Sequence, residues 1–196
     1  MTIECEKHLF SIIDHILSLS DAAKQAFLNA LQPVSFSKNE YLVRAGNTNG
    51  RLYFIHRGIV RFVYATESGK ELNKSFATEG SFVGCLRSML TEQPCRFSIQ
   101  ALEETESLFL SNEKRLELNR NYPEWQQFRC ILVEQLALKK ETREAEFLLD
   151  SAETRYRNFL NEYPDLVGRI PQYHIASYLG ITDVALSRIR KKLSHA

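Results

Sequence analysis

Glycine is concentrated in one part of the chain, and this divides the sequence into three segments. Six of the eight glycines lie between residues 34 and 110, among short runs of β-branched and aromatic residues. Within this segment, LYFIHRGIVRFVYATESGKEL reads as three strands separated by turns at Gly58 and Gly69. Several short strands with regular turn signals favour a compact antiparallel barrel or sandwich over alternating strands and helices. We therefore expect a β-roll in the middle of the chain.

Helical periodicity flanks the β-rich segment on both sides. Between residues 3 and 31 apolar residues recur every three or four positions, and Ser20 before Asp21 supplies an N-cap signal between two short helices. After Ser111 the chain reads as helical to its end, and Pro123 suits the first turn of a long helix that extends to Asp150. The expected fold class is α+β: an antiparallel β-roll with flanking helices and a long helix, then a small helical C-terminal domain.

The long helix carries two apolar stripes, which predict two buried faces. One stripe contains Phe128, Ile131, Leu138, Ala145 and Leu149, and the other contains Trp125, Leu132 and Leu136. One face can cover the β-roll, while the other can meet a second copy in a parallel seam that Gln135 and Thr142 interrupt. The alternative is that both stripes pack inside one monomer. The expected dimer-helix residues are Trp125, Phe128, Ile131, Leu132, Gln135 and Leu138.

A domain boundary is expected near Asp150. Asp150 and Glu153 resemble a capping box with Asp in place of Ser or Thr, which predicts a further helix through Tyr163, and Pro164 then interrupts the chain. We therefore divide the chain into residues 1–150 and residues 151–196.

The end of the chain predicts two short helices that cross at a tight turn. In IPQYHIASYLGITDVALSRIRKKL, Ile175, Ala176 and Leu179 face inward on the first helix. The small Ala176 allows a close crossing, Gly180 can take the left-handed conformation of the turn, and Thr182 caps the second helix. Leu186, Ile189 and Leu193 are its expected inward residues. This is the helix-turn-helix pattern.

Positive charge is local rather than global. The whole chain has 25 basic and 24 acidic side chains, but from Arg169 onward five Arg or Lys residues accompany the single acid Asp183. Such a segment is typical of a phosphate-binding face. The alternative is an exposed charged helix end.

The segment GRIPQYHIASYLGITDVALSRIRKKL closely resembles the C-terminal helix-turn-helix of the Crp/Fnr family of bacterial transcription regulators, which includes the cyclic-AMP receptor protein. LLDSAETRYRNFLNEYPDL is similar to that family's hinge and first DNA-domain helix, and LYFIHRGIVRFVY and EGSFVGCL are similar to its cyclic-nucleotide-binding β-roll. The resemblance implies a homodimer on double-stranded DNA, joined by the long helix. Its site is expected to be a pseudo-palindrome with half-sites about 34 Å apart.

The resemblance also implies which residues contact DNA. Arg188 falls where the family places an arginine that reads a guanine, while Asp183 and Val184 replace two base-reading residues of the cyclic-AMP receptor protein, so the target sequence is expected to differ. The remaining residues are expected to contact phosphates, sugars or base edges. The full expected set is Arg169, Gln172, Tyr173, Thr182, Asp183, Val184, Ser187, Arg188, Arg190, Lys191 and Lys192.

By the same resemblance, the nucleotide pocket is expected to be degenerate. The glutamate that holds the ribose is replaced by Cys85 in Gly84-Cys85-Leu86, and the arginine that pairs with the cyclic phosphate falls at Cys95. Arg96 is one residue out of register, which turns a strand side chain to the opposite face. We expect no useful cyclic-nucleotide binding; another small-molecule effector, or none, is left open. Cys85 and Cys95 are expected to be inert buried thiols, with a redox disulfide as the alternative.

Catalysis, a metal and a cofactor are not expected. A metal site in the roll needs converging histidines and a carboxylate, but the roll holds only His56, which we interpret as a surface or turn residue. His8, His15, His174 and His195 lie far away in sequence, and the four cysteines form no C-x-x-C pair. The acidic N-terminus and the absence of a long apolar run predict a cytoplasmic protein without a membrane partner.

Two functions are carried forward from the sequence. The first is a DNA-binding regulator for which RNA polymerase is a candidate partner. The alternative is a regulatory module that docks on a protein and has lost DNA binding, which Asp183 favours because its carboxylate repels phosphate.

Overall fold

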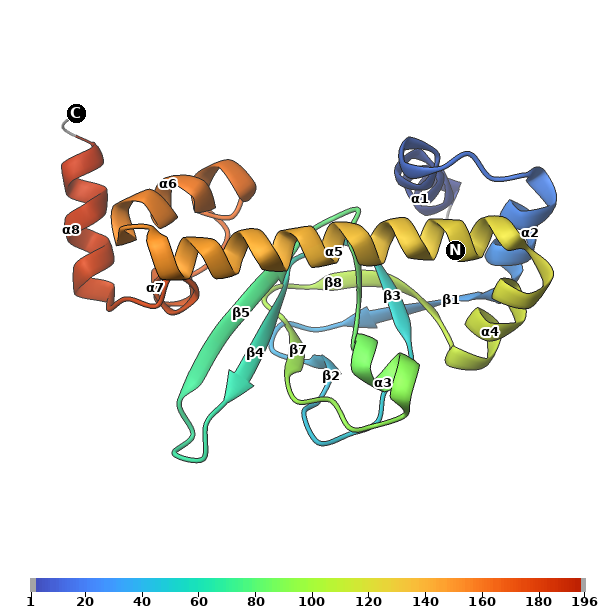
Figure 1. The fold of residues 1–196 in the computed structure, drawn as a ribbon, viewed down its shortest axis with the longest axis horizontal. Helices are drawn as coiled ribbons and strands as arrows, with labels where there is room; N and C mark the ends of the chain where they lie inside the picture. Colours follow the sequence, from blue (N-terminus) through green and yellow to red (C-terminus); the bar gives the residue numbers. More distant parts are fainter. Residues whose placement is uncertain (1–2, 195–196) are drawn as a thin grey trace. The chain divides into compact units, whose positions relative to one another are not determined.

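The computed structural model describes residues 3–194 and has the predicted α+β architecture. Helices α1 (Ile3–Ile16) and α2 (Asp21–Ala30) precede the strands, and Ser20 caps α2 by accepting a hydrogen bond from the Ala23 amide. The strands are interrupted by the short helix α3 (Leu86–Thr91). The C-terminal part is helical, as Figure 1 shows: α4 (Asn112–Asn121), α5 (Pro123–Leu149), α6 (Ala152–Glu162), α7 (Gln172–Leu179) and α8 (Asp183–Leu193).

Two four-stranded sheets form the β-roll. The first has the order β1 (Leu31–Phe36), β8 (Thr105–Leu110), β3 (Leu52–Arg57) and β6 (Phe82–Gly84), with antiparallel neighbours. The second has the order β2 (Tyr41–Val43), β7 (Ser98–Ala101), β4 (Val60–Ala65) and β5 (Glu71–Ala77). Consecutive strands β3 and β4 therefore belong to different sheets, so the segment read as three successive strands contains only one paired hairpin, β4–β5.

Gly58 and Gly69 both have the left-handed backbone that their turns require, but their surroundings differ. Gly58 has φ +108°, and a Cβ there would lie 2.6 Å from Thr105 Oγ1 and 2.7 Å from the Glu104 carbonyl oxygen. Gly69 has φ +80° and open space around it. Gly58 is thus needed for a close approach as well as for a turn, because the chain changes sheets there.

Aromatic packing joins the start of α5 to the N-terminal helices. The rings of Phe27 and Trp125 are 4.1 Å apart, and those of Trp125 and Phe128 are 5.3 Å apart. Trp125 Nε1 donates to the Ala23 carbonyl oxygen at 3.3 Å. The same cluster includes Leu108 of β8, so α5 covers the first sheet and α2 together.

The separation of Trp125 and Phe128 into two stripes is wrong. Residues three positions apart are neighbours on a helix surface, and both side chains enter one core cluster. Their exposed fractions of 5% and 2% leave almost no surface for a partner helix. The predicted dimer seam therefore loses Trp125 and Phe128, and Leu132, which packs partly against the same cluster, can contribute little.

The prediction that the capping box begins at Asp150 is also wrong, by one residue. Ser151 is the N-cap of α6, because its hydroxyl accepts from the Thr154 amide at 3.1 Å. The Asp150 amide donates to the Glu146 carbonyl oxygen at 3.0 Å and so continues the bonding of α5. The predicted helix nevertheless forms, and it ends at Glu162 with Tyr163 as C-cap.

Contacts divide the chain into two compact units. One contains residues up to Tyr64 and Ser75–Glu134, and the other contains Ala65–Lys74 and the residues from Gln135 onward. Helix α5 passes from the first unit into the second. A division into separately folding domains at residue 150 stays a prediction. None of the helices within residues 3–194 combines the length and apolar composition that a bilayer crossing requires.

We expect Gly58→Ala to be much more destabilising than Gly69→Ala. The first substitution adds a clash with the Glu104–Thr105 backbone to left-handed strain and should lower the free energy of unfolding by about 3 kcal/mol or more. The second adds strain alone, about 1 kcal/mol. Urea unfolding of both variants measures the difference, and equal losses would contradict the role given to Gly58.

Candidate functional site

Helices α7 and α8 form with the predicted turn between them. Gly180 is the C-cap of α7 with φ +69° and ψ +30°, and the Ile181 amide donates to the Ala176 carbonyl oxygen at 3.0 Å. Thr182 caps α8 by accepting from the Ala185 amide at 3.2 Å. Glycine is suited to the left-handed C-cap of α7, and threonine is suited to the N-cap of α8, so both caps follow from the sequence.

Burial along the two helices follows the predicted pattern. Fully buried side chains at the crossing are Ile175, Ala176, Leu179 and Leu186. Ile189 and Leu193 are half-buried. One side of α8 therefore faces the hydrophobic interior of the second unit, and the other side faces solvent.

Ten of the eleven expected DNA-contacting residues are exposed. The exposed set is Arg169, Gln172, Tyr173, Thr182, Asp183, Val184, Ser187, Arg188, Lys191 and Lys192. The eleventh, Arg190, is half-buried. Arg190 lies four residues after the buried Leu186, which places it at the edge of the inward face of α8.

One cation of α8 is already paired. Lys192 Nζ lies 2.6 Å from Glu153 Oε2, and Arg157 approaches the other oxygen of the same carboxylate at 3.2 Å. Hydrogen bonds from Lys192 and Arg157 lower the pKa of Glu153. Within residues 3–194 neither Arg188 nor Lys191 has an ion-pair partner, so these two exposed cations remain available on α8.

Two cations of α5 contact tyrosine side chains: Tyr163, the C-cap of α6, and Tyr178 of α7. The Arg143 guanidinium lies 3.5 Å from the centre of the Tyr178 ring and donates to the Tyr178 carbonyl oxygen. Lys139 Nζ lies 2.6 Å from Glu162 Oε1 and 3.0 Å from the Tyr163 hydroxyl. Burial lowers the pKa of Arg143 and raises that of Tyr178. These contacts fix α7 within the second unit.

These supporting residues were not predicted from the sequence. Lys139 and Arg143 are four residues apart on the long helix, so they share a face. The sequence did contain a signal for these contacts: two basic residues share one helix face and are followed by a segment rich in tyrosine. A polar contact was missed as well: the Asn73 side-chain amide donates to the His174 carbonyl oxygen at 3.0 Å, and its backbone amide donates to Ser177 Oγ at 3.0 Å.

The residues that align with the nucleotide pocket lie in and beside the second core cluster. Cys85 and Cys95 are buried there among Tyr53, Val83 and Ile99. Arg96 is exposed, while Gly84 and Leu86 are half-buried. Cys95 is therefore buried and Arg96 exposed, but both precede β7 (Ser98–Ala101), so the alternation of side chains along a strand does not explain the difference.

The two inward cysteines meet as thiols. Burial, followed by a hydrogen bond with Cys85, raises the pKa of Cys95 to about 11. Within residues 3–194 no disulfide joins these two cysteines, Cys5 or Cys130. Because the thiolate is the reactive form, the raised pKa makes Cys95 less reactive, which favours the expected inert thiols over the alternative of a redox disulfide.

The interpretation of His56 as a surface or turn residue is wrong. It is half-buried on β3, and its Nδ1 atom lies 3.1 Å from Nδ1 of His8, which a helix far away in sequence supplies. Burial, and then the charge of His56, lower the pKa of His8. His195 lies outside the described residues. Within residues 3–194 no group of three His, Cys, Asp or Glu residues is arranged to hold a metal ion.

The roll also matches known proteins. Residues 33–122, somewhat less than half of the chain, match a family model described as a cyclic nucleotide-binding domain. No curated protein sequence matches the chain significantly.

Three solved structures are similar over most of both chains. The c-di-GMP-responsive global regulator CLP of Xanthomonas campestris matches with TM-score 0.71 and 17% identity, over 90% of this chain and 92% of that one. FixK2 of Bradyrhizobium japonicum matches with TM-score 0.73 and 17% identity, over 84% and 85%. The catabolite activator protein of Thermus thermophilus matches with TM-score 0.59 and 23% identity, over 94% and 87%.

These comparisons establish the fold. The chain has a cyclic-nucleotide-binding β-roll, a long helix and C-terminal helices, arranged in the same order as in catabolite activator protein.

We expect one cysteine to react rapidly with a thiol reagent in the native protein. Cys130 is exposed, whereas Cys5, Cys85 and Cys95 are buried. Ellman's reagent should therefore modify one thiol quickly and the other three only after denaturation, and Cys130→Ser should abolish the fast phase. Fast modification of Cys85 or Cys95 in the native state would contradict the burial of this pair.

Proposed function

We propose that this chain is a sequence-specific DNA-binding transcription regulator of the Crp/Fnr type, which acts as a homodimer on a pseudo-palindromic site and does not depend on cyclic AMP. The observation that carries the proposal is the two-sided character of α8. Leu186 anchors one side in the interior, while Arg188 and Lys191 extend into solvent without an ion-pair partner among the described residues. In this proposal residues 1–150 are the sensor part and residues 151–196 the DNA-binding part.

In the proposed complex α8 enters the major groove. Arg188 donates both arms of its guanidinium to O6 and N7 of a guanine, a contact worth about 1 to 3 kcal/mol of discrimination. Val184 is 61% exposed in the first turn of α8 and suits contact with a thymine methyl group. Arg169, Lys191, the N-cap Thr182 and the hydroxyl of Ser187 are assigned to phosphates or base edges.

The proposed dimer uses the outer stripe of α5. With Trp125 and Phe128 committed to the protomer core, the stripe continues at alternating spacings of three and four residues through Ile131, Gln135, Leu138, Thr142, Ala145 and Leu149. Leu138 is 64% exposed and Leu149 is 83% exposed. Covering such leucines with a second copy recovers about 25 cal/mol for each Å² of apolar surface removed from water.

Independence from cyclic AMP is inferred from the interior of the roll. A cyclic phosphate needs an opposing charge when it is buried, and Cys95 supplies none. Arg96 is exposed, so its charge lies on the other face of the chain at that position. The thiols of Cys85 and Cys95 also offer no carboxylate for a ribose hydroxyl.

A module that docks on a protein is the second candidate. The Lys192–Glu153 ion pair favours it, because it removes one cation from the face that would meet phosphate. Asp183 adds a negative charge to the same face, although an acid in the first turn of a helix also complements the helix dipole. Such a module would show no salt-dependent binding to any selected DNA.

Arg188→Ala and Lys191→Ala should affect DNA binding differently. On a selected DNA fragment, Arg188→Ala should lower affinity for the preferred site by about 10- to 100-fold and relax the preference at one base of each half-site. Lys191→Ala should weaken all sequences alike and reduce the slope of log affinity against log salt by about 1 per subunit. Gel shifts over a salt series measure both effects. Binding that is insensitive to salt, or absent, would favour the docking module.

Leu138→Glu should convert the dimer to a monomer. The substitution places a charge at the centre of the proposed seam on both helices, where like charges face each other. Leu136→Glu is the matched control, because Leu136 is an exposed leucine of the same helix outside the seam. Sedimentation equilibrium should give twice the chain mass for the wild type and the control. A wild type of single-chain mass would contradict the dimer.

A further inference from the structure

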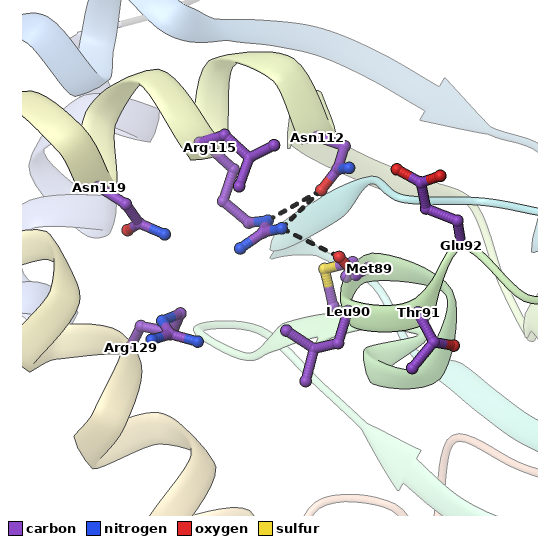
Figure 2. A pocket seen from close by; sticks show the side chains of 9 residues that line it. Met89, Leu90, Thr91, Glu92, Asn112, Arg115, Asn119 and Arg129 are labelled. Atoms are coloured by element: carbon purple, nitrogen blue, oxygen red, sulfur yellow. Dashed lines mark hydrogen bonds between the residues drawn. The ribbon is translucent and has the colours of Figure 1, made fainter.

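A cavity in the first unit brings two arginines together without an acidic partner. Its volume is about 420 Å³, and it lies between α3, α4 and the start of α5. As Figure 2 shows, Arg115 of α4 and Arg129 of α5 both direct their guanidinium groups toward it. Among residues 3–194 no carboxylate forms an ion pair with either group.

Arg115 is held rigidly at the wall of this cavity. It is 9% exposed, and it donates from Nε at 3.1 Å and Nη2 at 2.7 Å to Asn112 Oδ1, and from Nη2 at 3.0 Å to the Met89 carbonyl oxygen. All of these acceptors are neutral. Burial, and then the charge of Arg129, lower the pKa of Arg115. The site therefore fixes one cation in place and leaves its charge uncompensated.

The Arg129 side chain has fewer hydrogen-bond partners than that of Arg115. Its Nε–H is buried and has no hydrogen-bond partner, and no other partner of this side chain is found among the described residues. A buried donor without an acceptor costs about 1 to 3 kcal/mol, and such a group in a native protein is commonly explained by a bound ion, water or ligand. Two like charges and a donor without an acceptor surround one cavity. This arrangement points to a negatively charged hydrogen-bond acceptor as the group that binds there.

The rest of the lining indicates what the anion carries. Met89, Leu90 and Leu116 give the cavity apolar surface, and Asn119 and Thr91 add neutral polar groups. Glu92 is the one acid of the lining, and Figure 2 shows it at the end of the cavity away from Arg129. A cavity of this volume, with a few polar groups beside apolar walls, is of the size that binds small organic molecules.

We propose that Arg115 and Arg129 bind the carboxylate or phosphate of a small organic anion whose carbon body contacts Met89, Leu90 and Leu116. The planar guanidinium fork matches both oxyanions, and each charge-assisted bond formed in this partly buried site is stronger than a neutral one. Neither Cys85 nor Cys95 lines the cavity, and the proposal is independent of whether the chain binds DNA.

Calorimetric titration of the full-length protein tests the site. The probes are glycerol 3-phosphate for an organic phosphate, succinate for an organic carboxylate, and inorganic phosphate for the anion without a carbon body, all at constant ionic strength. We expect saturable binding of at least one organic anion, tighter than that of inorganic phosphate. The comparison of the first two probes distinguishes the two head groups. Equal affinity for inorganic phosphate would overturn the assignment of a carbon body.

Arg129→Gln is the decisive variant, because Arg129 has no hydrogen-bond or ion-pair partner among the described residues. It should weaken binding of the organic anion at least about tenfold, since it removes one charge-assisted bond. Without ligand it should leave the thermal midpoint unchanged or higher, because it removes an unsatisfied donor and a like charge. Arg120→Gln, an exposed arginine of α4 outside the lining, is the matched control and should bind as the wild type does.

Three results would overturn the proposal. The first is the absence of saturable binding for all three probes. The second is equal binding by Arg129→Gln and Arg120→Gln. The third is a large drop in the thermal midpoint of Arg129→Gln without ligand, because it would mean that Arg129 serves the fold.

Discussion

The burial of the first turns of α5 is the constraint on which the rest of the account depends. Trp125 and Phe128 occupy the core that α1, α2 and the first sheet share, and this fixes the rotation of the helix about its own axis. Because a helix repeats every 3.6 residues, these two buried residues are excluded from the proposed dimer stripe of Ile131, Leu138 and Leu149. Within the second unit, Lys139 contacts Glu162 and Tyr163, and Arg143 contacts Tyr178 of α7.

The fold could be predicted from the sequence wherever a local signal decides the structure. Ser20 and Thr182 cap their helices because each supplies a side-chain oxygen where the backbone amides lack partners. Gly180 adopts the left-handed conformation that the turn needs. Asp150 and Ser151 are adjacent, and both are good capping residues. The choice between them depends on where the backbone hydrogen bonds of α5 end, which the local pattern does not reveal.

Long-range contacts were the part that the sequence did not reveal. The pairing of Lys192 with Glu153, the contact of His8 with His56, and the cavity shared by Arg115 and Arg129 all join residues from different elements. Spacing along one helix cannot predict them, because they depend on how separate elements pack. The exposed face of α8, in contrast, follows from the period of a single helix. It was therefore predicted well, apart from Arg190 at its edge.

The basic side chains of this nearly neutral chain differ in whether they pair with an acid, pack against aromatic rings or have no acidic partner. Lys192 is neutralised by α6, Lys139 and Arg143 serve packing, and the roll interior at Cys85 and Cys95 is uncharged. Among the described residues, Arg188 and Lys191 on α8 and Arg115 and Arg129 around the cavity have no acidic partner. The proposed DNA-binding face and the proposed anion site both follow from this distribution.

Selection of bound DNA from a random duplex pool tests the central claim most directly. The account predicts enrichment of an inverted repeat whose half-site centres are about one helical turn, 10 to 10.5 base pairs, apart. A pool that yields no enriched sequence, or only a single half-site without its symmetric counterpart, would contradict it.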